Sequence, residues 1–341
     1  MSIAIKRLGR TGLKVSEVAL GTMAFGRWID ERKSAEVLDA ALDAGITLLD
    51  TADVYGKGSD RGNPLEGGQS ETILGNLLGA RRRNIILATK VHGRVGNGPN
   101  DQGQSRYHII RAVEDSLRRL KTDYIDLYQV HRFDSETPLE ESLRALDDLV
   151  RQGKVRYIGA SNFAAWQLAK AHGISALLNL HRYESVQPEY SLIAREAERE
   201  LLPFAKSEGV GVIVYSPLGR GLLTGKYRFN AEPPAGTRGA AGEARIKPLL
   251  ENERNFRIVE GLKPIAERKG WTLAQLALTW VLSQQAVTSA ILGASSPEHV
   301  TESVARAGEK LSAEELAEID AITGEAASAL PSLQETAAAR G

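Results

Sequence analysis

The 341-residue sequence contains no cysteine. It can therefore form no disulfide and supply no thiolate nucleophile, cysteine-ligated zinc or iron–sulfur cluster. Its charges balance, with 43 lysine and arginine residues against 43 aspartate and glutamate residues, and no basic block stands out. Because nucleic acids and anionic membranes bind concentrated positive charge, neither is an expected partner. Any catalysis must use side chains other than cysteine.

Long apolar runs are also absent. No segment approaches the roughly 18 apolar residues that span a membrane. Lys6 and Arg7 interrupt the N-terminus before the apolar stretch of a secretory signal could form. With 33 glycines and 12 prolines the chain is not of low complexity, and 42% of its residues are hydrophobic. We therefore expect a cytoplasmic globular protein with a large core.

Short apolar runs that end in polar residues alternate along the chain with segments of helical periodicity. Eight such runs predict strands, at 15–21, 46–50, 85–90, 124–131, 155–162, 185–187, 210–215 and 289–293. The clearest helix is predicted over 137–152, with Thr137 as the N-cap and Pro138 as the first helical residue. Further helices are predicted at 31–43, 71–78, 107–119, 194–207, 257–269, 273–283 and 297–307.

Strands that alternate with helices predict a parallel sheet, either open or closed. An open, doubly wound sheet usually carries a glycine-rich turn after its first strand, and this sequence has none there. A closed barrel gathers the C-terminal ends of all its strands at one site, which is where the polar residues stand here. We therefore predict an α/β fold, a (β/α)8 TIM barrel that forms a single domain over residues 1–325.

Three segments lie outside the predicted barrel units. Residues 5–13 are expected to form an N-terminal β-hairpin ahead of the barrel. Residues 230–243, rich in glycine, proline and alanine, are expected to form a lid after the seventh strand, since loops of this length are usually functional. The C-terminal end is expected to consist of a helix and an alanine- and serine-rich tail, 326–341, that is partly disordered.

Four residues near the predicted strand ends suit a proton-transfer site. Asp50, Lys90 and His131 follow one another at intervals of about one β/α unit, and Tyr55 lies shortly after Asp50, so a barrel would bring all four together. A lysine beside a phenol makes the phenol a better proton donor, and Asp50 would orient that lysine. A histidine can donate a second hydrogen bond to a developing alkoxide. This chemistry suits carbonyl reduction with hydride from a bound cofactor.

Seven ordered motifs resemble those of the aldo-keto reductases, over almost the whole chain. They are Gly21-Thr22-Met23, 49–56 (LDTADVYG), Ala88-Thr89-Lys90, Gln129-Val130-His131-Arg132, 159–163 (GASNF), Gln187-Pro188-Glu189-Tyr190 and 215–219 (YSPLG). The resemblance implies a (β/α)8 barrel that reduces an aldehyde or ketone, a small-molecule carbonyl substrate, with a nicotinamide cofactor. It also implies a catalytic tetrad of Asp50, Tyr55, Lys90 and His131.

The resemblance further implies that the cofactor extends across the strand ends. Ser161, Asn162 and Gln187 would hold the nicotinamide carboxamide, and Tyr215 would stack on the nicotinamide ring. Ser216, Leu218 and Gly221 would line the pyrophosphate. The other implied cofactor contacts are Gly21, Thr22, Met23, Asp50, Lys226, Gly293, Ser295, His299 and Glu302.

The adenosine end of this implied site departs from the family pattern. Ser295 and His299 stand where the family usually has basic or amide residues around the adenosine phosphate. Arg220 and Lys226 could supply the missing positive charge. NADPH is therefore the predicted cofactor, and NADH is the alternative.

The substrate pocket is expected to be lined by Tyr55 and His131 together with two aromatic residues after the first strand, Phe25 and Trp28. For both aromatic residues ordinary packing is an equal alternative, because large aromatic side chains near strand ends often serve only the core. The loops around the strand ends would determine the substrate, and the sequence does not predict their conformations.

Two other functions remain open. Channel-associated β-subunits also resemble this family and keep the tetrad, so a nicotinamide-binding regulatory or channel-associated subunit with little turnover is one alternative. A glycosidase on the same barrel is the other, because Asp50, Asp134 and Glu189 lie near strand ends and glycosidases use paired carboxylates. The glycosidase would leave Lys90 and Tyr55 without a role.

Overall fold

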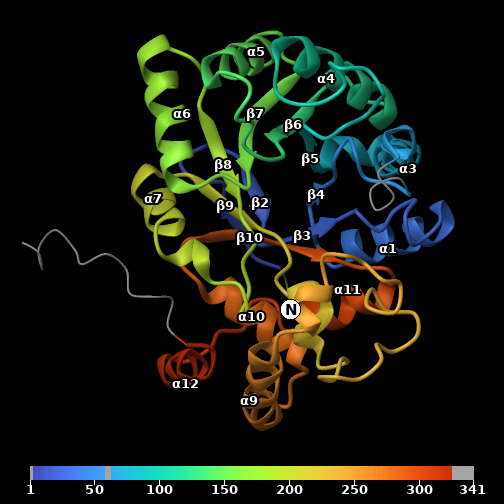
Figure 1. Cartoon of the computed structure of the whole chain (residues 1–341), viewed down its shortest axis with the longest axis vertical. Helices are drawn as coiled ribbons and strands as arrows, with labels where there is room; N and C mark the ends of the chain where they lie inside the picture. Colours follow the sequence, from blue (N-terminus) through green and yellow to red (C-terminus); the bar gives the residue numbers. More distant parts are fainter. Residues whose placement is uncertain (1–2, 58–62, 325–341) are drawn as a thin grey trace, which may run out of the picture.

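The computed structural model describes residues 3–57 and 63–324, and its centre is a closed barrel of parallel strands (Figure 1). The strands pair in the order β10-β3-β4-β5-β6-β7-β8-β9, so each pairs with the next along the chain and β10 returns to β3. Helices form the layer outside the strands. The predicted (β/α)8 barrel is therefore confirmed, and the sheet is not open and doubly wound.

The barrel strands lie close to the eight predicted runs. They are β3 (Val18–Gly21), β4 (Leu48–Asp50), β5 (Ile86–Val91), β6 (Ile125–Val130), β7 (Val155–Ser161), β8 (Tyr183–Gln187), β9 (Gly211–Val214) and β10 (Val287–Gly293). The first predicted run, 15–21, is divided. Its beginning belongs to β2 (Lys14–Ser16), which pairs antiparallel with β1 (Ile5–Arg7), and only its second half enters the barrel. The predicted N-terminal hairpin is thus confirmed.

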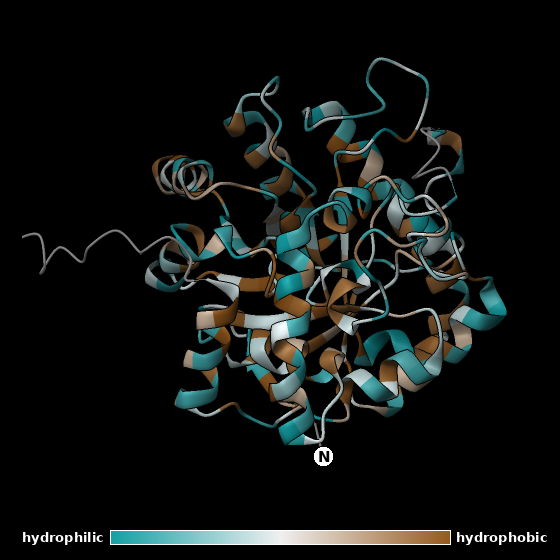
Figure 2. Cartoon of the chain, turned by 60° about the horizontal axis from the view of Figure 1, so that its bottom comes forward, coloured by the Kyte–Doolittle hydropathy of each residue, from teal (hydrophilic) through white to brown (hydrophobic). Residues whose placement is uncertain are grey.

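The hairpin fills the N-terminal end of the barrel. Leu8 and Val15 are fully buried and belong to one apolar cluster with side chains from the barrel strands, namely Ala19, Leu48, Ala88, Leu127, Ile213 and Ile291. In Figure 2 the strands are coloured mainly as hydrophobic, whereas the outer helices carry hydrophilic segments. Because apolar side chains fill this end, polar interior residues are confined to the opposite, C-terminal end of the strands.

The α-helices of the described residues are α1 (Glu31–Asp43), α3 (Gln69–Leu78), α4 (Arg106–Leu120), α5 (Leu139–Arg151), α6 (Ala165–Leu178), α7 (Leu201–Glu208), α8 (Lys247–Leu250), α9 (Glu253–Lys269), α10 (Leu273–Ser283), α11 (Pro297–Val304) and α12 (Ala313–Thr323). Short 3-10 segments span Pro64–Glu66, Gly79–Asn84, Glu196–Glu198 and Gly219–Thr224.

Helix α6 was not predicted, because its apolar residues lie on all sides; Leu177, for example, is 83% exposed. The short α8 was also missed.

Two predicted helices begin differently in the structure. Pro138 is the N-cap of α5, and the Thr137 hydroxyl donates to Asp134 Oδ2 (2.8 Å) instead of capping the helix. The helix predicted over 194–207 is divided into a 3-10 turn and α7. Pro203 lies in the first turn of α7, where its missing N–H is tolerated, but a longer helix would need that N–H.

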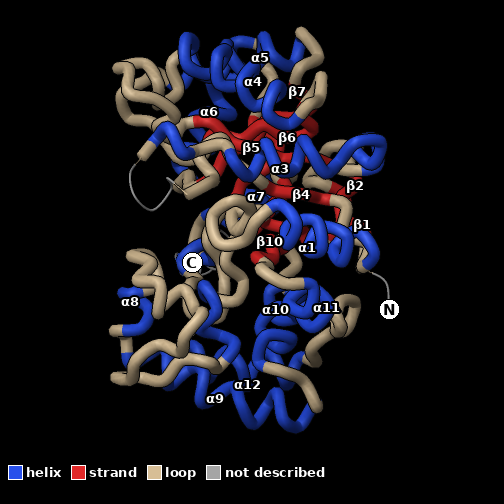
Figure 3. The backbone as a smooth tube through the Cα atoms, turned by 90° about the vertical axis from the view of Figure 1, so that its right-hand side faces the viewer, coloured by secondary structure: helices blue, strands red, loops and turns tan. Residues whose placement is uncertain are grey.

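Helices α8 to α12 gather at one end of the molecule, the bottom of Figure 3. Within this group α9 contacts α8, α10 and α12. The predicted C-terminal helix is α12, and the predicted tail 326–341 lies outside the described residues, so the domain boundary at 325 stays a prediction. Across 3–57 and 63–324, no helix combines the length and the apolar composition needed to cross a lipid bilayer.

Candidate active site

A layer of buried polar side chains lies at the C-terminal end of the barrel strands. Strand residues alternate between the two faces of a sheet, so the residue two positions after an interior apolar residue also points inward. Asp50 therefore points inward like Leu48 on β4, and Lys90 points inward like Ala88 on β5. The layer contains Asp50, Lys90, Gln129, Ser161 and Gln187, one residue from each strand between β4 and β8.

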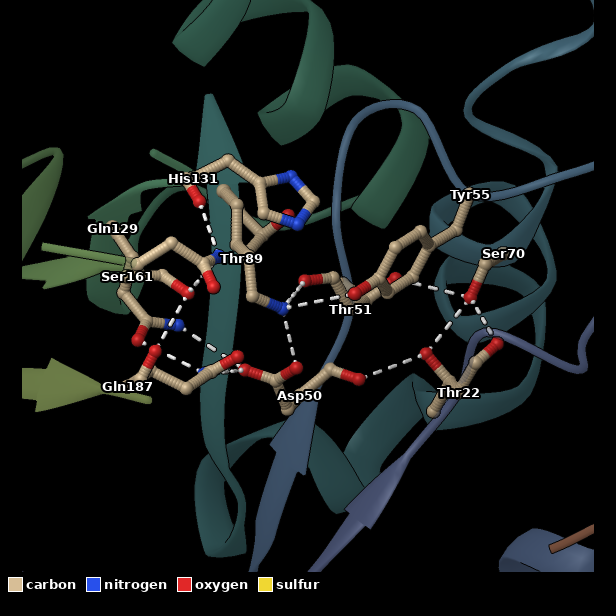
Figure 4. Close-up of polar contacts among 12 residues, drawn as sticks. Thr22, Asp50, Thr51, Tyr55, Ser70, Thr89, Gln129, His131, Ser161 and Gln187 are labelled. Atoms are coloured by element: carbon tan, nitrogen blue, oxygen red, sulfur yellow. Dashed lines mark hydrogen bonds and ion pairs between the residues drawn. The ribbon is translucent and has the colours of Figure 1, made fainter. Parts of the chain in front are cut away.

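Lys90 is fully buried and is held by three acceptors, one each on Asp50, Thr51 and Tyr55, which Figure 4 labels. Its Nζ donates to the Asp50 carboxylate, to the Thr51 carbonyl (2.8 Å) and to Tyr55 Oη (3.4 Å). Burial by itself would lower the pKa of Lys90. The negative charge of Asp50 and the Tyr55 oxygen outweigh burial and raise the pKa of Lys90 above its ordinary value. Lys90 is therefore a fixed positive charge beside the Tyr55 hydroxyl.

Asp50 connects this lysine to the amide side chains of the layer. Its Oδ2 accepts hydrogen bonds from Gln129 Nε2 (3.1 Å) and Gln187 Nε2 (2.8 Å), and Gln187 Nε2 also donates to Gln129 Oε1 (3.1 Å). With Lys90 on its other oxygen, Asp50 has partners on both sides of its carboxylate. A buried charge with this many partners has one stable orientation, so Asp50 sets the position of Lys90.

His131 follows β6 and packs edge-on against Tyr55, with ring centroids 5.9 Å apart and an angle of 75° between the rings. Asn162 Nδ2 donates to the His131 carbonyl (2.9 Å) and so ties the end of β6 to the end of β7. Burial, and then the positive charge of Lys90, hold the pKa of His131 well below its usual value. The imidazole is therefore neutral at neutral pH and can still donate one N–H hydrogen bond.

A second chain of hydrogen bonds links the ends of β7, β8 and β9. The Ser161 hydroxyl donates to the Gln187 carbonyl (2.9 Å), and Asn162 Nδ2 donates to Ser161 Oγ (3.0 Å). The Tyr215 hydroxyl donates to Asn162 Oδ1 (2.8 Å), while burial raises the pKa of Tyr215 to about 12. Asn162 has a φ of 56°, a left-handed conformation that asparagine tolerates better than most residues. These four residues form a rigid polar surface beside the predicted tetrad.

This surface borders a cavity of about 1440 Å³. That volume exceeds the roughly 300–1,000 Å³ of most small-molecule sites, as expected for a site that takes a dinucleotide and a substrate together. The predicted cofactor and substrate residues that border it are Gly21, Met23, Trp28, Asp50, Tyr55, His131, Ser161, Asn162, Gln187, Tyr215, Ser216, Leu218, Gly221, Lys226, Gly293, Ser295, His299 and Glu302. Of the three acids considered for a glycosidase, Asp50 borders the cavity, and Asp134 and Glu189 do not.

Three predicted site residues do not border the cavity. Lys90 lies behind Tyr55, with its Nζ 3.4 Å from Tyr55 Oη. Thr22 is fully buried; its hydroxyl donates to the Asp50 carbonyl (3.2 Å) and is 2.8 Å from Ser70 Oγ, so it supports the end of β4 and does not face a cofactor. Phe25 is also fully buried, in the apolar core, so it serves packing and is not a wall of the substrate pocket.

Positive charge is concentrated where the loop 227–246 meets Trp28. The guanidinium carbons of Arg27 and Arg238 lie 4.2 Å and 4.5 Å from the centroid of the Trp28 ring. Glu243 lies 3.8 Å from Arg27 and 3.9 Å from Arg238. Burial lowers the pKa of Lys226, and the charge of Arg238 lowers it further. Each of these positive charges disfavours the protonated form of its neighbour, so a bound anion would stabilise them. The phosphates of a dinucleotide are anions of this kind.

The shape of the cavity also fits an extended cofactor. Gly21 and Gly293 are partners in the β3–β10 register and both border the cavity, and the Ile291 side chain, which also borders it, fills the space beside Gly21. The loop predicted as a lid, 230–243, contributes Arg238 and several small residues to the cavity wall. Figure 1 shows the loop as a long excursion beside α11. The loop therefore forms part of the cavity wall together with the strand ends.

Sequence reasoning missed several residues that the structure brings to this site. Gln129 was recognisable, because it points inward two positions after Leu127 on β6. Arg27, Arg238 and Arg245 border the cavity from loops, and no strand periodicity could have placed them there. Among the residues that the structure describes, no group of three or more histidines and acids is placed to hold a metal ion.

Comparison with known proteins agrees with this geometry. A model of the Aldo/keto reductase family matches residues 17–323. The chain belongs to this family. It is 41% identical over 304 residues to the "Uncharacterized oxidoreductase YrpG" of Bacillus subtilis, covering 87% of this chain and 89% of that protein. As a member of the family, this aldo-keto reductase is an oxidoreductase.

Other relatives carry different names. The chain is 36% identical over 336 residues to a "Versiconal hemiacetal acetate reductase" of Aspergillus parasiticus, covering 91% of this chain and 94% of the relative. It is 37% identical over 314 residues to a "Probable voltage-gated potassium channel subunit beta" of Arabidopsis thaliana, covering 88% and 89% of the two chains. The relatives thus include both a named reductase and named channel subunits.

Behind the site, this aldo-keto reductase buries a second carboxyl group, Asp53. Asp53 is 1% exposed, and no side chain of the described residues donates a hydrogen bond to either carboxyl oxygen. The backbone N–H of Val54 lowers the pKa of Asp53 less than burial raises it. Burial, and then the negative charge of Glu71, hold the pKa of Asp53 well above its usual range. Glu71 itself is bound by Thr89 Oγ1 (2.5 Å) and Arg119 Nε (2.7 Å). The folded protein therefore holds a proton on Asp53 at pH values where the unfolded chain has lost it.

We expect Asp53→Asn to raise the free energy of unfolding at neutral pH by about 1 kcal/mol, because folding must protonate the buried Asp53, which the unfolded chain leaves ionised, and asparagine needs no proton. The gain should shrink as the pH falls toward the ordinary carboxyl pKa, since Asp53 is then protonated in both states. Urea unfolding of both proteins between acidic and neutral pH measures this difference. Asp123→Asn, at an exposed position, is the control. A gain that grows toward acidic pH would contradict a raised pKa.

Proposed function

We propose that this aldo-keto reductase reduces an aldehyde or ketone to an alcohol with NADPH. The observation that supports the proposal most is the arrangement of Tyr55, Lys90 and His131. Tyr55 and His131 border the cavity side by side, and the protonated Lys90 lies 3.4 Å behind the Tyr55 hydroxyl. A proton donor and a neutral hydrogen-bond donor thus lie side by side in the cavity wall, with a fixed positive charge behind the proton donor.

In the proposed reaction Tyr55 donates its hydroxyl proton to the carbonyl oxygen of the substrate. Lys90 stabilises the phenolate that this leaves on Tyr55, and Asp50 keeps Lys90 in place. His131 donates a hydrogen bond to the same substrate oxygen and stabilises the charge that develops there. When bound, the nicotinamide cofactor supplies the hydride that the carbonyl carbon receives.

The chain offers separate groups for the two ends of NADPH. Ser161, Asn162 and Gln187 would hold the nicotinamide carboxamide, and Tyr215 would contact its ring, because their polar atoms are already fixed by one another. Lys226 and Arg238 of the lid would bind the phosphates, including the 2′-phosphate that distinguishes NADPH from NADH. The cytoplasmic location expected from the sequence stays a prediction.

Two measurements test the proposal. The first follows the absorbance of the reduced nicotinamide after addition of a model aldehyde, and the second compares the binding of NADPH and NADH in parallel titrations. We expect loss of NADPH absorbance and roughly tenfold tighter binding of NADPH, because one charge-assisted contact with the 2′-phosphate is worth about 1.4 kcal/mol or more. Arg238→Met should reduce this preference, while NADH binding serves as the internal control. Equal binding of the two nucleotides by the unmodified protein would contradict the choice of NADPH.

The relatives named as potassium channel β-subunits support one alternative, a nicotinamide-binding regulatory or channel-associated subunit. Such a protein would bind NADPH through the same cavity and show little turnover. Tight NADPH binding without reduction of any aldehyde or ketone in a panel would favour this alternative. Steady turnover would favour the reductase.

A further inference from the structure

Two arginines border the cavity beside the proposed reaction centre and have no part in the mechanism above. Arg132 directly follows His131 after the end of β6. Arg245 lies near the end of the loop 227–246, directly before the buried Ile246. Both side chains are exposed, and both border the cavity that Tyr55 and His131 border. We refer to Arg132 and Arg245 as the cationic pair.

The charges of the cationic pair act at the reaction end of the cavity. After burial and Lys90, both arginines contribute to the lowered pKa of His131. The positive charge of Arg245 also offsets part of the rise that burial causes in the pKa of Tyr215. Arg132 directly follows His131, and Arg245 borders the same cavity as Tyr55 and His131, so both charges lie at the cavity where the carbonyl group would react.

The cationic pair lacks protein counter-charges. Within 3–57 and 63–324, no carboxylate lies within 4.0 Å of either guanidinium, and no hydrogen bond from either guanidinium is formed there. By contrast, Arg220 lies 3.4 Å from Glu189, and Arg238 lies 3.9 Å from Glu243.

The carboxylate nearest to Arg132 in the sequence, Asp134, has other partners. It accepts hydrogen bonds from the backbone N–H of Gln104 (2.8 Å) and of Glu136 (3.0 Å), and from the Thr137 hydroxyl (2.8 Å). No carboxylate of the described residues therefore pairs with Arg132, whose positive charge lies beside His131 and borders the cavity. Such a site favours a ligand that brings its own negative charge.

We propose that the substrate is an anionic carbonyl compound, whose carboxylate or phosphate group is bound by Arg132 and Arg245 while its carbonyl oxygen faces Tyr55 and His131. This inference rests on the proposed reductase function and names its substrate class. Guanidinium groups present parallel N–H donors that match the oxygens of a carboxylate or phosphate. An anion held from two sides fixes the direction of the rest of the molecule, so the cationic pair determines specificity and leaves proton transfer to Tyr55.

The first test compares 4-carboxybenzaldehyde with its methyl ester, which has nearly the same shape and no charge. We expect kcat/KM of the unmodified protein to be at least about tenfold higher for the carboxylate. Arg245→Met and Arg132→Met should each reduce this ratio severalfold, mainly through a higher KM for the carboxylate, and Arg245→Lys should restore part of it. Arg228→Met, in the same loop but outside the cavity, should keep the ratio of the unmodified protein.

A second measurement does not depend on turnover. Calorimetric binding of benzoate, with benzamide as the neutral counterpart, should show a preference for benzoate that Arg245→Met removes and Arg228→Met keeps. Glyceraldehyde 3-phosphate compared with glyceraldehyde shows whether a phosphate serves in place of the carboxylate. A higher kcat/KM for either charged member of a pair, lost in Arg245→Met, supports the proposal.

Two results overturn the proposal in distinguishable ways. Equal kcat/KM for the charged and neutral member of both pairs, with good turnover of the neutral aldehydes, would overturn the anionic substrate and leave the reductase intact. The absence of turnover with every aldehyde would contradict the proposed function itself. In that case a benzoate preference that depends on Arg245 would still establish an anion site.

Discussion

Tyr55→Phe is expected to lower kcat for aldehyde reduction by about 10²- to 10⁴-fold, the usual contribution of a positioned proton donor. Phenylalanine keeps the ring that packs edge-on against His131 and loses only the hydroxyl that borders the cavity. Because Lys90 keeps its bonds to Asp50 and to the Thr51 carbonyl, the surrounding layer should stay in place. Steady-state kinetics with a model aldehyde measure the loss.

The same variant should bind NADPH with nearly the affinity of the unmodified protein, since no proposed cofactor contact is removed. A fluorescence titration and a thermal unfolding curve check that the loss is chemical and not structural. Tyr107→Phe is a matched control, because Tyr107 is 57% exposed and lies outside the cavity. Turnover of Tyr55→Phe close to that of the unmodified protein would rule out Tyr55 as the proton donor.

Lys90→Met is expected to lower both activity and stability. Methionine fills a similar volume, but it leaves the buried Asp50 with hydrogen bonds only from Gln129 and Gln187. Removing one partner of a buried ion pair usually costs about 3–5 kcal/mol, because the remaining charge is uncompensated. The proposed phenolate on Tyr55 also loses its nearest positive charge, so kcat should fall by about 10²-fold or more. Urea unfolding and steady-state kinetics measure the two effects.

A double variant separates these two consequences. Asp50→Asn combined with Lys90→Met removes both charges, so the free energy of unfolding should recover much of its loss while kcat stays low. Lys170→Met, at an exposed position on α6, controls for removal of a lysine as such. If Lys90→Met were as stable as the unmodified protein, Asp50 would have to be protonated or reached by water, contrary to its buried ion pair.

The barrel itself was predictable because local patterns determine it. Each apolar run had the length of one strand and was followed by a helical segment. Residues two positions apart on a strand point to the same side, so Asp50 points inward like Leu48, and Lys90 points inward like Ala88. The boundaries were less predictable. The run 15–21 contains two strands because Glu17 interrupts it, donating its backbone N–H to the Ala4 carbonyl (2.8 Å) outside the barrel.

The two aromatic residues after β3 show that the hydrophobic periodicity does not predict the directions of loop side chains. Phe25 and Trp28 are three residues apart in one loop, and nothing in the sequence distinguishes them as candidates for the pocket wall. In the structure Phe25 is buried in the core and Trp28 borders the cavity between two guanidinium groups. Loop backbones have no fixed period, so the direction of a loop side chain depends on what packs against it.

The sequence by itself determined the barrel, the polar layer at its C-terminal end and the meeting of Asp50, Lys90 and His131, because strand alternation and the closure of a barrel dictate all three. Tyr55 lies in the loop after β4, so the packing of that loop decided the direction of its side chain. Only the tertiary structure decided which cations border the cavity. Arg132 and Arg245 are more than a hundred residues apart in the sequence, and they share a cavity because the loop 227–246 and the strand ends line it together. Their charges therefore combine only after the chain has folded.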